Sequence, residues 1–177
     1  MLLIAFKNQV RSASTEAQCL DFFTRSATPY RSGGITKKFN QQLHDQYDPP
    51  ARKAVSDWVH MKWGADCIPN PNEFGVDLIV LREGKPVGYI EVEVRSWNYC
   101  HYSTIHVAHR KEKLFQQDLP VLFFALTQDL AHAYWCHAKV AKGYPLIEVK
   151  NFEVPTGEMF FDIPVEKFKY VDLTDQF

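Results

Sequence analysis

Three carboxylates between residues 77 and 93 are the strongest candidates for chemistry in this chain. Asp77 falls within Val76–Leu81, an apolar run rich in β-branched residues, so we expect it on a partly covered strand surface. Glu91 and Glu93 belong to the alternating segment Val87–Arg95. Because successive side chains of a strand point to opposite faces, these two carboxylates should lie side by side on one face.

The segment between the two runs predicts that they pair as a hairpin. Residues 83–86, Glu-Gly-Lys-Pro, supply turn chemistry, and the glycine is free to take a positive φ. Converging carboxylates repel one another, and partial burial makes their charge costlier. Either a shared proton or a bound cation relieves this, and hard oxygen ligands suit Mg²⁺ or Mn²⁺.

The alternative is that Glu91 and Glu93 merely line the solvated face of an ordinary hairpin. Asp77 is harder to explain in this way, because it interrupts an apolar run. Its position favours a metal site over a solvated surface.

The succession of Asp77, a hairpin and Glu91-Val92-Glu93 resembles the PD-(D/E)XK nuclease superfamily. In that superfamily an acidic residue starts one strand and a (D/E)-x-K triplet lies on the next. The sequence differs from this pattern in two places. Val76 precedes Asp77 where proline is usual, and Glu93 occupies the position of the lysine.

The resemblance implies roles for these residues. Asp77 and Glu91 would hold Mg²⁺ or Mn²⁺, with help from the backbone carbonyl of Val92. Glu93 would complete the site or orient the attacking water. Glu73, four residues before Asp77, is a further candidate for the metal shell, and its alternative is a solvated loop residue.

Lys111 is the candidate for the missing lysine. The segment Thr104–Gln117 is predicted to be a helix, and Lys111 falls in the middle of its apolar arc. A lysine in such a place either snorkels outward or points at the sheet near the carboxylates. In relatives of the superfamily the catalytic lysine can move to this helix. The resemblance therefore implies that Lys111 orients the water or stabilises the pentavalent phosphate.

Basic and imidazole side chains follow the second strand and are predicted to contact the phosphates of a nucleic acid, although a solvated helix face would also explain them. They are Arg95, His106, His109, Arg110 and Lys113. The segment Ser96–Tyr102 interleaves aromatic and polar residues, which could stack bases or close the core over the sheet. The formal net charge of −1 counts against strong non-specific binding to nucleic acid.

Length and composition predict a single domain, residues 1–177, with a substantial core. The chain has 177 residues, of which 46% are hydrophobic and 23% charged, as in ordinary globular proteins. No apolar run approaches the ~20 residues that span a bilayer. The four cysteines are scattered without a C-x-x-C motif, which favours free thiols in a reducing cytoplasm over a zinc module. We therefore expect a cytoplasmic protein without membrane contact.

The order of predicted elements indicates an α/β fold, more closely an α+β fold with a mixed sheet. The resemblance implies a restriction-endonuclease-like core, in which helices flank a central mixed β-sheet in the order α-β-β-α-β-β. We assign 1–50 to an N-terminal helical extension, 51–138 to the core, and 139–177 to C-terminal strands and a tail that packs on the core. The expected elements outside the hairpin are a strand at 1–6, helices at 15–25, 37–47, 48–64 and 104–117, a loop at 65–72, and strands at 119–126 and 131–138.

A second triplet, Glu148-Val149-Lys150, matches the E-x-K pattern literally. Its upstream acid would be Asp129, which lies at a strand end, and no convincing basic helix follows. The order of elements therefore favours the first site.

The sequence thus predicts a metal-dependent nuclease that hydrolyses phosphodiester bonds of DNA, expected to be an endonuclease. A nuclease-fold domain without catalysis, which binds nucleic acid or protein, is the alternative. A phosphohydrolase acting on small substrates is weaker, because the chain has no nucleotide-binding glycine-rich loop. A homodimer remains open, since compact nucleases of this kind often work as dimers.

Overall fold

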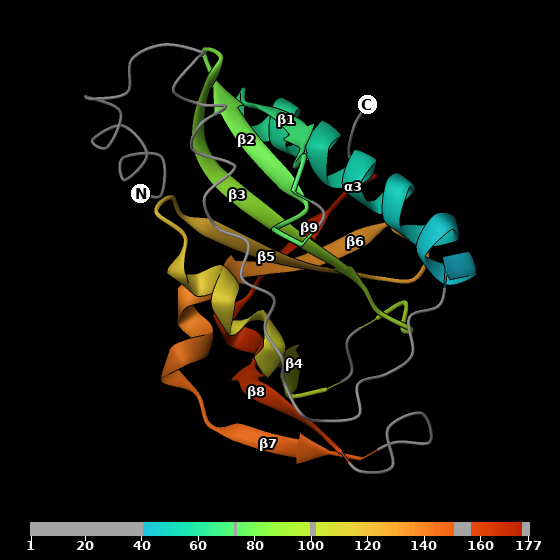
Figure 1. Ribbon diagram of the computed structural model, residues 1–177. Helices are drawn as coiled ribbons and strands as arrows, with labels where there is room; N and C mark the ends of the chain where they lie inside the picture. The colour runs from blue at the N-terminus through green and yellow to red at the C-terminus, as the bar shows by residue number, and fades with distance from the viewer. Residues whose placement is uncertain (1–40, 73, 100–101, 151–156, 175–177) are drawn as a thin grey trace.

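The computed structural model describes residues 41–72, 74–99, 102–150 and 157–174. These residues form an α+β fold in which a long helix and a small second sheet cover the two faces of a larger sheet (Figure 1). The strand predicted at 1–6 and the helix predicted at 15–25 lie outside the described residues. Within the described ranges, no helix is long and apolar enough to cross a membrane.

The larger sheet is mixed, as predicted. Its six strands follow the order β1-β2-β3-β5-β6-β9. Strands β3 and β5 are parallel neighbours, whereas the other neighbours are antiparallel. The strands are β1 (Asp66–Pro69), β2 (Leu78–Arg82), β3 (Lys85–Val94), β5 (Val121–Leu126), β6 (His132–His137) and β9 (Lys169–Asp172).

The predicted hairpin is present as β2 and β3. Glu83 and Gly84 form its two-residue loop, with φ values of 52° and 73°. Positive φ at both positions is the requirement of the turn that matches the twist of paired strands. The register places Leu78 opposite Ile90, so Asp77 enters the sheet beside the middle of β3.

One continuous helix, α3 (Gln41–Trp63), replaces the two helices predicted at 37–47 and 48–64. Pro49 and Pro50 lie inside it and do not start a new helix. Each proline removes one backbone hydrogen bond, which costs helix stability. The buried face of α3, which includes Ala51 and Val55, packs against the larger sheet and offsets this cost.

The second sheet has three strands in the order β4-β8-β7. They are β4 (Thr104–Ala108), β8 (Glu158–Pro164) and β7 (Leu146–Val149). Short 3₁₀ segments adjoin it, namely η1 (His109–Gln116), η2 (Ala138–Gly143) and η3 (Val165–Lys167).

The helix predicted at 104–117 is therefore wrong, because this segment divides into β4 and η1. Ile105 and Val107 are buried with a period of two, and the backbone of β4 pairs with β8. This pairing is long-range and outweighs the local helical pattern. The order α-β-β-α-β-β consequently lacks its second α-helix. The loop predicted at 65–72 is also wrong in part, since it contains β1 paired with β2.

Two apolar clusters hold the larger sheet between its coverings. Phe124 is fully buried on the α3 side, where it stacks on Trp135 with ring centroids 5.9 Å apart. Phe123 lies on the opposite side with Phe115 of η1 and Phe161 of β8. Strand β8 thus contributes Phe161 to the core. The carboxylates of β3 face the side that η1 and the second sheet cover.

Candidate functional site

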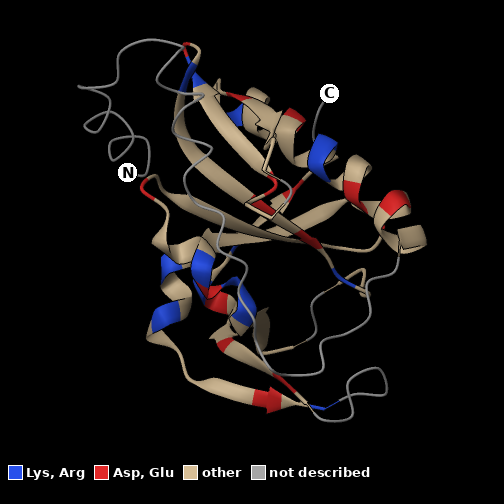
Figure 2. Ribbon diagram, viewed as in Figure 1, with Lys and Arg blue, Asp and Glu red and all other residues tan. Residues whose placement is uncertain are grey.

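Glu91 and Glu93 stand on the face of β3 that looks toward η1, and Asp77 lies just before β2. Figure 2 shows acidic residues on the middle of β3 and basic residues on η1, between β4 and β5. Only 12% of the Glu91 side chain and 27% of the Glu93 side chain is exposed. The carboxylates are therefore removed from most of the solvent that would otherwise stabilise their charge.

Asp77 is held by contacts to both of its oxygens. Arg52 Nη2 of α3 donates a hydrogen bond to Asp77 Oδ1 over 2.7 Å, and the backbone N–H of Val92 donates to Oδ2 over 2.7 Å. Burial raises the pKa of Asp77, although the Val92 hydrogen bond and the Arg52 charge oppose this effect. The bond to Val92 fixes Asp77 beside Glu91.

Lys111 bridges the two glutamates of β3. Its Nζ lies 2.9 Å from Glu91 Oε1 and 2.9 Å from Glu93 Oε2. The ammonium also lies 5.4 Å from the centroid of the Phe123 ring. Lys111 therefore points at the sheet and does not snorkel outward, although a 3₁₀ segment and not an α-helix carries it.

The environment separates the pKa values of the two glutamates. Burial raises the pKa of Glu91 to about 7, despite the opposing charge of Lys111. Burial acts on Glu93 in the same direction, but the charges of Arg95 and Lys111 outweigh it and lower its pKa to about 2. Burial alone would lower the pKa of Lys111, yet the two glutamates raise it. Lys111 is thus fully protonated at neutral pH, whereas Glu91 can exchange a proton there.

Three basic side chains balance the three carboxylates. Arg52 pairs with Asp77, Lys111 with both glutamates, and Arg95 Nη1 lies 3.2 Å from Glu93 Oε1. A shared proton or a bound cation was the expected relief for the repulsion between these carboxylates. These internal ion pairs provide a third form of relief.

Glu91 has the feature that best fits a divalent cation. Its Oε2 is buried and accepts no hydrogen bond from the described residues. A buried carboxylate oxygen without a hydrogen-bond donor destabilises the folded state, and coordination of Mg²⁺ or Mn²⁺ would offset this cost. Asp77 supplies a second hard oxygen donor nearby. The donors therefore fit such an ion in type, although the described residues contain no ready cluster of three His, Cys, Asp or Glu ligands.

The remaining predicted metal ligands are Glu73 and the backbone carbonyl of Val92. Glu73 lies outside the described residues. Val92 contributes through its N–H, which holds Asp77, and its predicted contribution was through the carbonyl.

The residues predicted to contact phosphates do not form one arc, because the helix on which that prediction depended is absent. His106 Nε2 lies 3.2 Å from Asp162 Oδ1 of β8, and Arg110 pairs with Glu158 of the same strand. His109 Nε2 lies 3.0 Å from Glu112 Oε2, and Lys113 Nζ donates to the carbonyl of Phe74 over 3.0 Å. Arg95 adjoins the carboxylates themselves. The structure thus brings Asp77, Glu91, Glu93, Arg95 and Lys111 together and places the others around η1 and β4.

Sequence reasoning missed Arg52 and its neighbour Asp48. Arg52 Nη2 lies 2.6 Å from Asp48 Oδ2, one helical turn away, as well as contacting Asp77. The signal was present, because Arg52 borders the buried positions Ala51 and Val55 of the same helix. A basic residue at the margin of an apolar face, in a helix that packs on the sheet, is placed to meet a buried acid.

The second triplet does not assemble a comparable cluster. Glu148 lies on β7 at the edge of the second sheet, and its side chain is 51% exposed. Asp129 instead accepts a hydrogen bond from the hydroxyl of Thr127. The preference for the first site thus agrees with the geometry.

Comparisons of this chain with protein-family models, with curated proteins and with solved structures gave no match.

Proposed function

We propose that this protein is a metal-dependent phosphodiesterase of the PD-(D/E)XK type that cleaves DNA, with an endonuclease as the expected form. The observation that carries the proposal is the Lys111 ammonium, which lies 2.9 Å from both Glu91 and Glu93. Lys111 of η1 would thereby supply the lysine that the triplet Glu91-Val92-Glu93 lacks. The proposed fold is a restriction-endonuclease-like core, which the mixed sheet with α3 on one face supports.

Asp77 and Glu91 are the proposed ligands of Mg²⁺ or Mn²⁺. When bound, the ion would lower the pKa of a water molecule and offset charge on the scissile phosphate. Without the ion, burial raises the pKa of Glu91 to about 7, so a proton would compete with the metal for this carboxylate and metal binding should strengthen as pH rises through 7. Lys111 keeps its charge, so it can attract a phosphate oxygen and hold Glu93 in place.

The test is cleavage of single-stranded, duplex and branched DNA with Mg²⁺, with Mn²⁺ or with EDTA. We expect cutting that depends on the metal and that Glu91→Gln abolishes. Lys111→Met should reduce the rate by about 10²–10³-fold, as expected when one charge-stabilising donor is removed. Glu148→Gln and Lys150→Met are matched controls, because they alter the second triplet and should leave the rate unchanged.

A binding module without catalysis is the second candidate, and one observation favours it. Arg52, Lys111 and Arg95 already balance the three carboxylates without an ion. In that case no DNA would be cut, neither Mg²⁺ nor Mn²⁺ would raise the melting temperature, and Glu91→Gln would leave DNA binding intact. Metal-dependent cutting that Glu91→Gln eliminates would exclude this candidate.

A further inference from the structure

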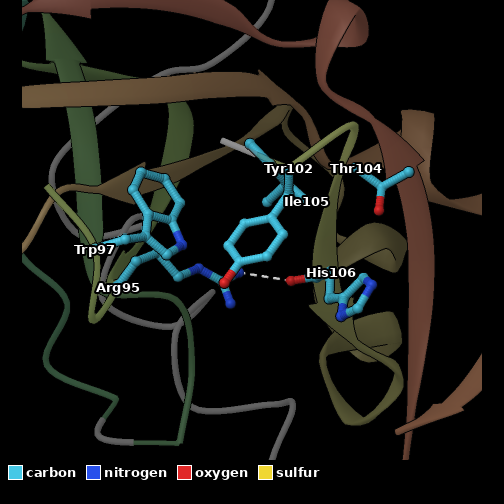
Figure 3. A pocket seen from close by; sticks show the side chains of 6 residues that line it. All are labelled: Arg95, Trp97, Tyr102, Thr104, Ile105 and His106. Atoms are coloured by element: carbon cyan, nitrogen blue, oxygen red, sulfur yellow. Dashed lines mark hydrogen bonds between the residues drawn. The ribbon is translucent and has the colours of Figure 1, made fainter. Parts of the chain in front are cut away.

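A pocket of about 300 Å³ opens beside the carboxylates (Figure 3). Its lining comes from the segment between β3 and β4 and from β4 itself. The lining residues are Arg95, Trp97, Tyr102, Thr104, Ile105 and His106. The volume lies at the lower end of the range for small-molecule sites, so the pocket suits a single ring system better than an extended ligand.

Arg95 joins the pocket to the carboxylates. Its Nη1 lies 3.2 Å from Glu93 Oε1, and its Nη2 donates to the backbone carbonyl of His106 over 2.6 Å. The dashed line in Figure 3 marks the second contact. One guanidinium group therefore forms part of the pocket wall and also holds a carboxylate of the proposed active site. Only the Arg95 side chain would separate a group bound in the pocket from Glu93 of the proposed active site.

The chemistry of the lining selects a flat aromatic ligand. Trp97 and Tyr102 present ring surfaces, and the planar guanidinium of Arg95 can stack in the same way. Figure 3 shows the side chains of Thr104 and His106 on the other side of β4 from Trp97, and His106 Nε2 lies 3.2 Å from Asp162 Oδ1. The polar groups on the Trp97 side, which can form hydrogen bonds to the edge of a heterocycle, are the Arg95 guanidinium and the Tyr102 hydroxyl. Such a combination of ring surfaces and polar groups is how proteins bind unstacked nucleobases.

Trp97 and Tyr102 differ in how much of each side chain is packed against the core. Trp97 is partly buried and packs edge-on against Tyr134, with centroids 5.7 Å apart at an angle of 76°. It therefore belongs partly to the core. Tyr102 is 65% exposed, so its truncation removes little buried area from the core. Tyr102 is thus the side chain whose removal tests ligand binding without disturbing the fold.

We propose that this pocket binds one unstacked nucleobase of the strand whose phosphate lies at Asp77 and Glu91. The inference rests on the proposed function and narrows its substrate to single-stranded or locally unpaired nucleic acid. A base within a regular duplex is stacked on both sides and cannot enter without being extruded, which costs a few kcal/mol. Mismatched, branched or single-stranded sites avoid most of that cost.

The experiment measures binding of oligodeoxynucleotides that contain 2-aminopurine, by wild-type full-length protein in EDTA, where no cleavage occurs. We expect the single strand to bind more tightly than the matched duplex and its fluorescence to be quenched by stacking. Tyr102→Ala should weaken single-strand binding by at least about fivefold, the lower end for loss of one base–aromatic contact. Tyr102→Phe should restore it, because the ring is kept.

Two controls separate stacking from general effects. Leu146→Ala removes an exposed apolar side chain of β7, the edge strand on the other side of β8 from β4, and should leave the affinity unchanged. An abasic nucleotide in place of 2-aminopurine should remove the difference between wild type and Tyr102→Ala. Trp97→Phe provides a second variant that keeps the packing on Tyr134 while reducing the ring surface.

The outcomes distinguish this inference from the proposed function. Metal-dependent cleavage together with unchanged binding by Tyr102→Ala would overturn the base pocket and leave the nuclease standing. Binding that depends on Tyr102, without cleavage of any substrate, would overturn the nuclease and leave a base-binding module. Equal affinity for single strand and duplex in every variant would also overturn the pocket.

Discussion

Glu91→Gln should stabilise the folded protein at pH 8 in the absence of metal. Burial raises the pKa of Glu91 from its ordinary 4.5 to about 7. Between those pH values the folded chain retains a proton that the unfolded chain has released. The free energy of unfolding therefore falls as pH rises through this window, and the contribution of Glu91 is largest below pH 4.5.

The size of the effect follows from the shift. Each pKa unit corresponds to about 1.4 kcal/mol, so a shift of this size costs the wild type about 3 kcal/mol at pH 8. Glutamine resembles the protonated acid and does not titrate. The variant should therefore gain up to about 3 kcal/mol over the wild type at pH 8 and little or nothing near pH 4.5. Asp77, whose pKa is also raised, adds a slope of the same sign to both proteins.

Urea denaturation of both proteins in EDTA, at intervals from pH 4.5 to 8.5, measures the difference. Adding Mg²⁺ at pH 8 should narrow it, because the ion binds the ionised wild type and stabilises its folded state. If the free energies of unfolding of the two proteins changed in parallel with pH across the whole range, the reasoning would be refuted, because the pKa of Glu91 would then not be raised by folding.

Glu93→Gln is the matched contrast within the same strand. The pKa of Glu93 is lowered to about 2, so its stabilising contribution is present above pH 4.5 and is lost as pH falls toward 2. This variant should lose up to about 3 kcal/mol at pH 7, where Glu91→Gln gains stability. Shifts of the same sign for both variants would show that Lys111 and Arg95 do not distinguish the two carboxylates.

Two further substitutions test the supports of the site. Arg52→Gln removes the cation that pairs with Asp77, so titration calorimetry at pH 8 should show tighter binding of Mn²⁺. The free energy of unfolding should fall by about 1–3 kcal/mol. An unchanged Mn²⁺ affinity would mean that Arg52 does not compete with the metal. Phe124→Ala empties a fully buried position between α3 and the sheet and should cost about 3–5 kcal/mol in thermal or urea unfolding. A loss below about 1 kcal/mol would contradict the close packing of Phe124.

The hairpin and its carboxylates could be predicted from sequence because their signals are local. The alternation of β3 and the Glu83-Gly84 turn are specified by neighbouring residues, and the structure contains both. The charge of Lys111 within an apolar pattern left two orientations open, outward or toward the sheet, and the resemblance to the nuclease superfamily favoured the second. Lys111 points at the sheet although a 3₁₀ segment and not an α-helix carries it, because either conformation buries Leu114 and Phe115.

The segment at 104–117 shows what the sequence alone could not decide. Ile105 and Val107 fit a strand, and they also fit the apolar arc of a longer helix. What decides between them is pairing with β8, more than fifty residues later. Pro49 and Pro50 misled in the opposite way, because they indicated the start of a new helix, whereas packing of α3 on the sheet keeps one helix continuous through them.

The position of Lys111 on the connection between β3 and β5 has a consequence for how the protein folds. Adjacent parallel strands require a long crossover, and this one passes through β4, which must find β8 near the end of the chain. The β2–β3 hairpin closes over a two-residue loop and can form early, before these distant partners meet. Glu91 and Glu93 then stand together before the ammonium arrives to neutralise them. Acid should therefore speed the refolding reaction, and the amides of β4, which wait for β8, should acquire hydrogen-exchange protection later than those of the β2–β3 hairpin.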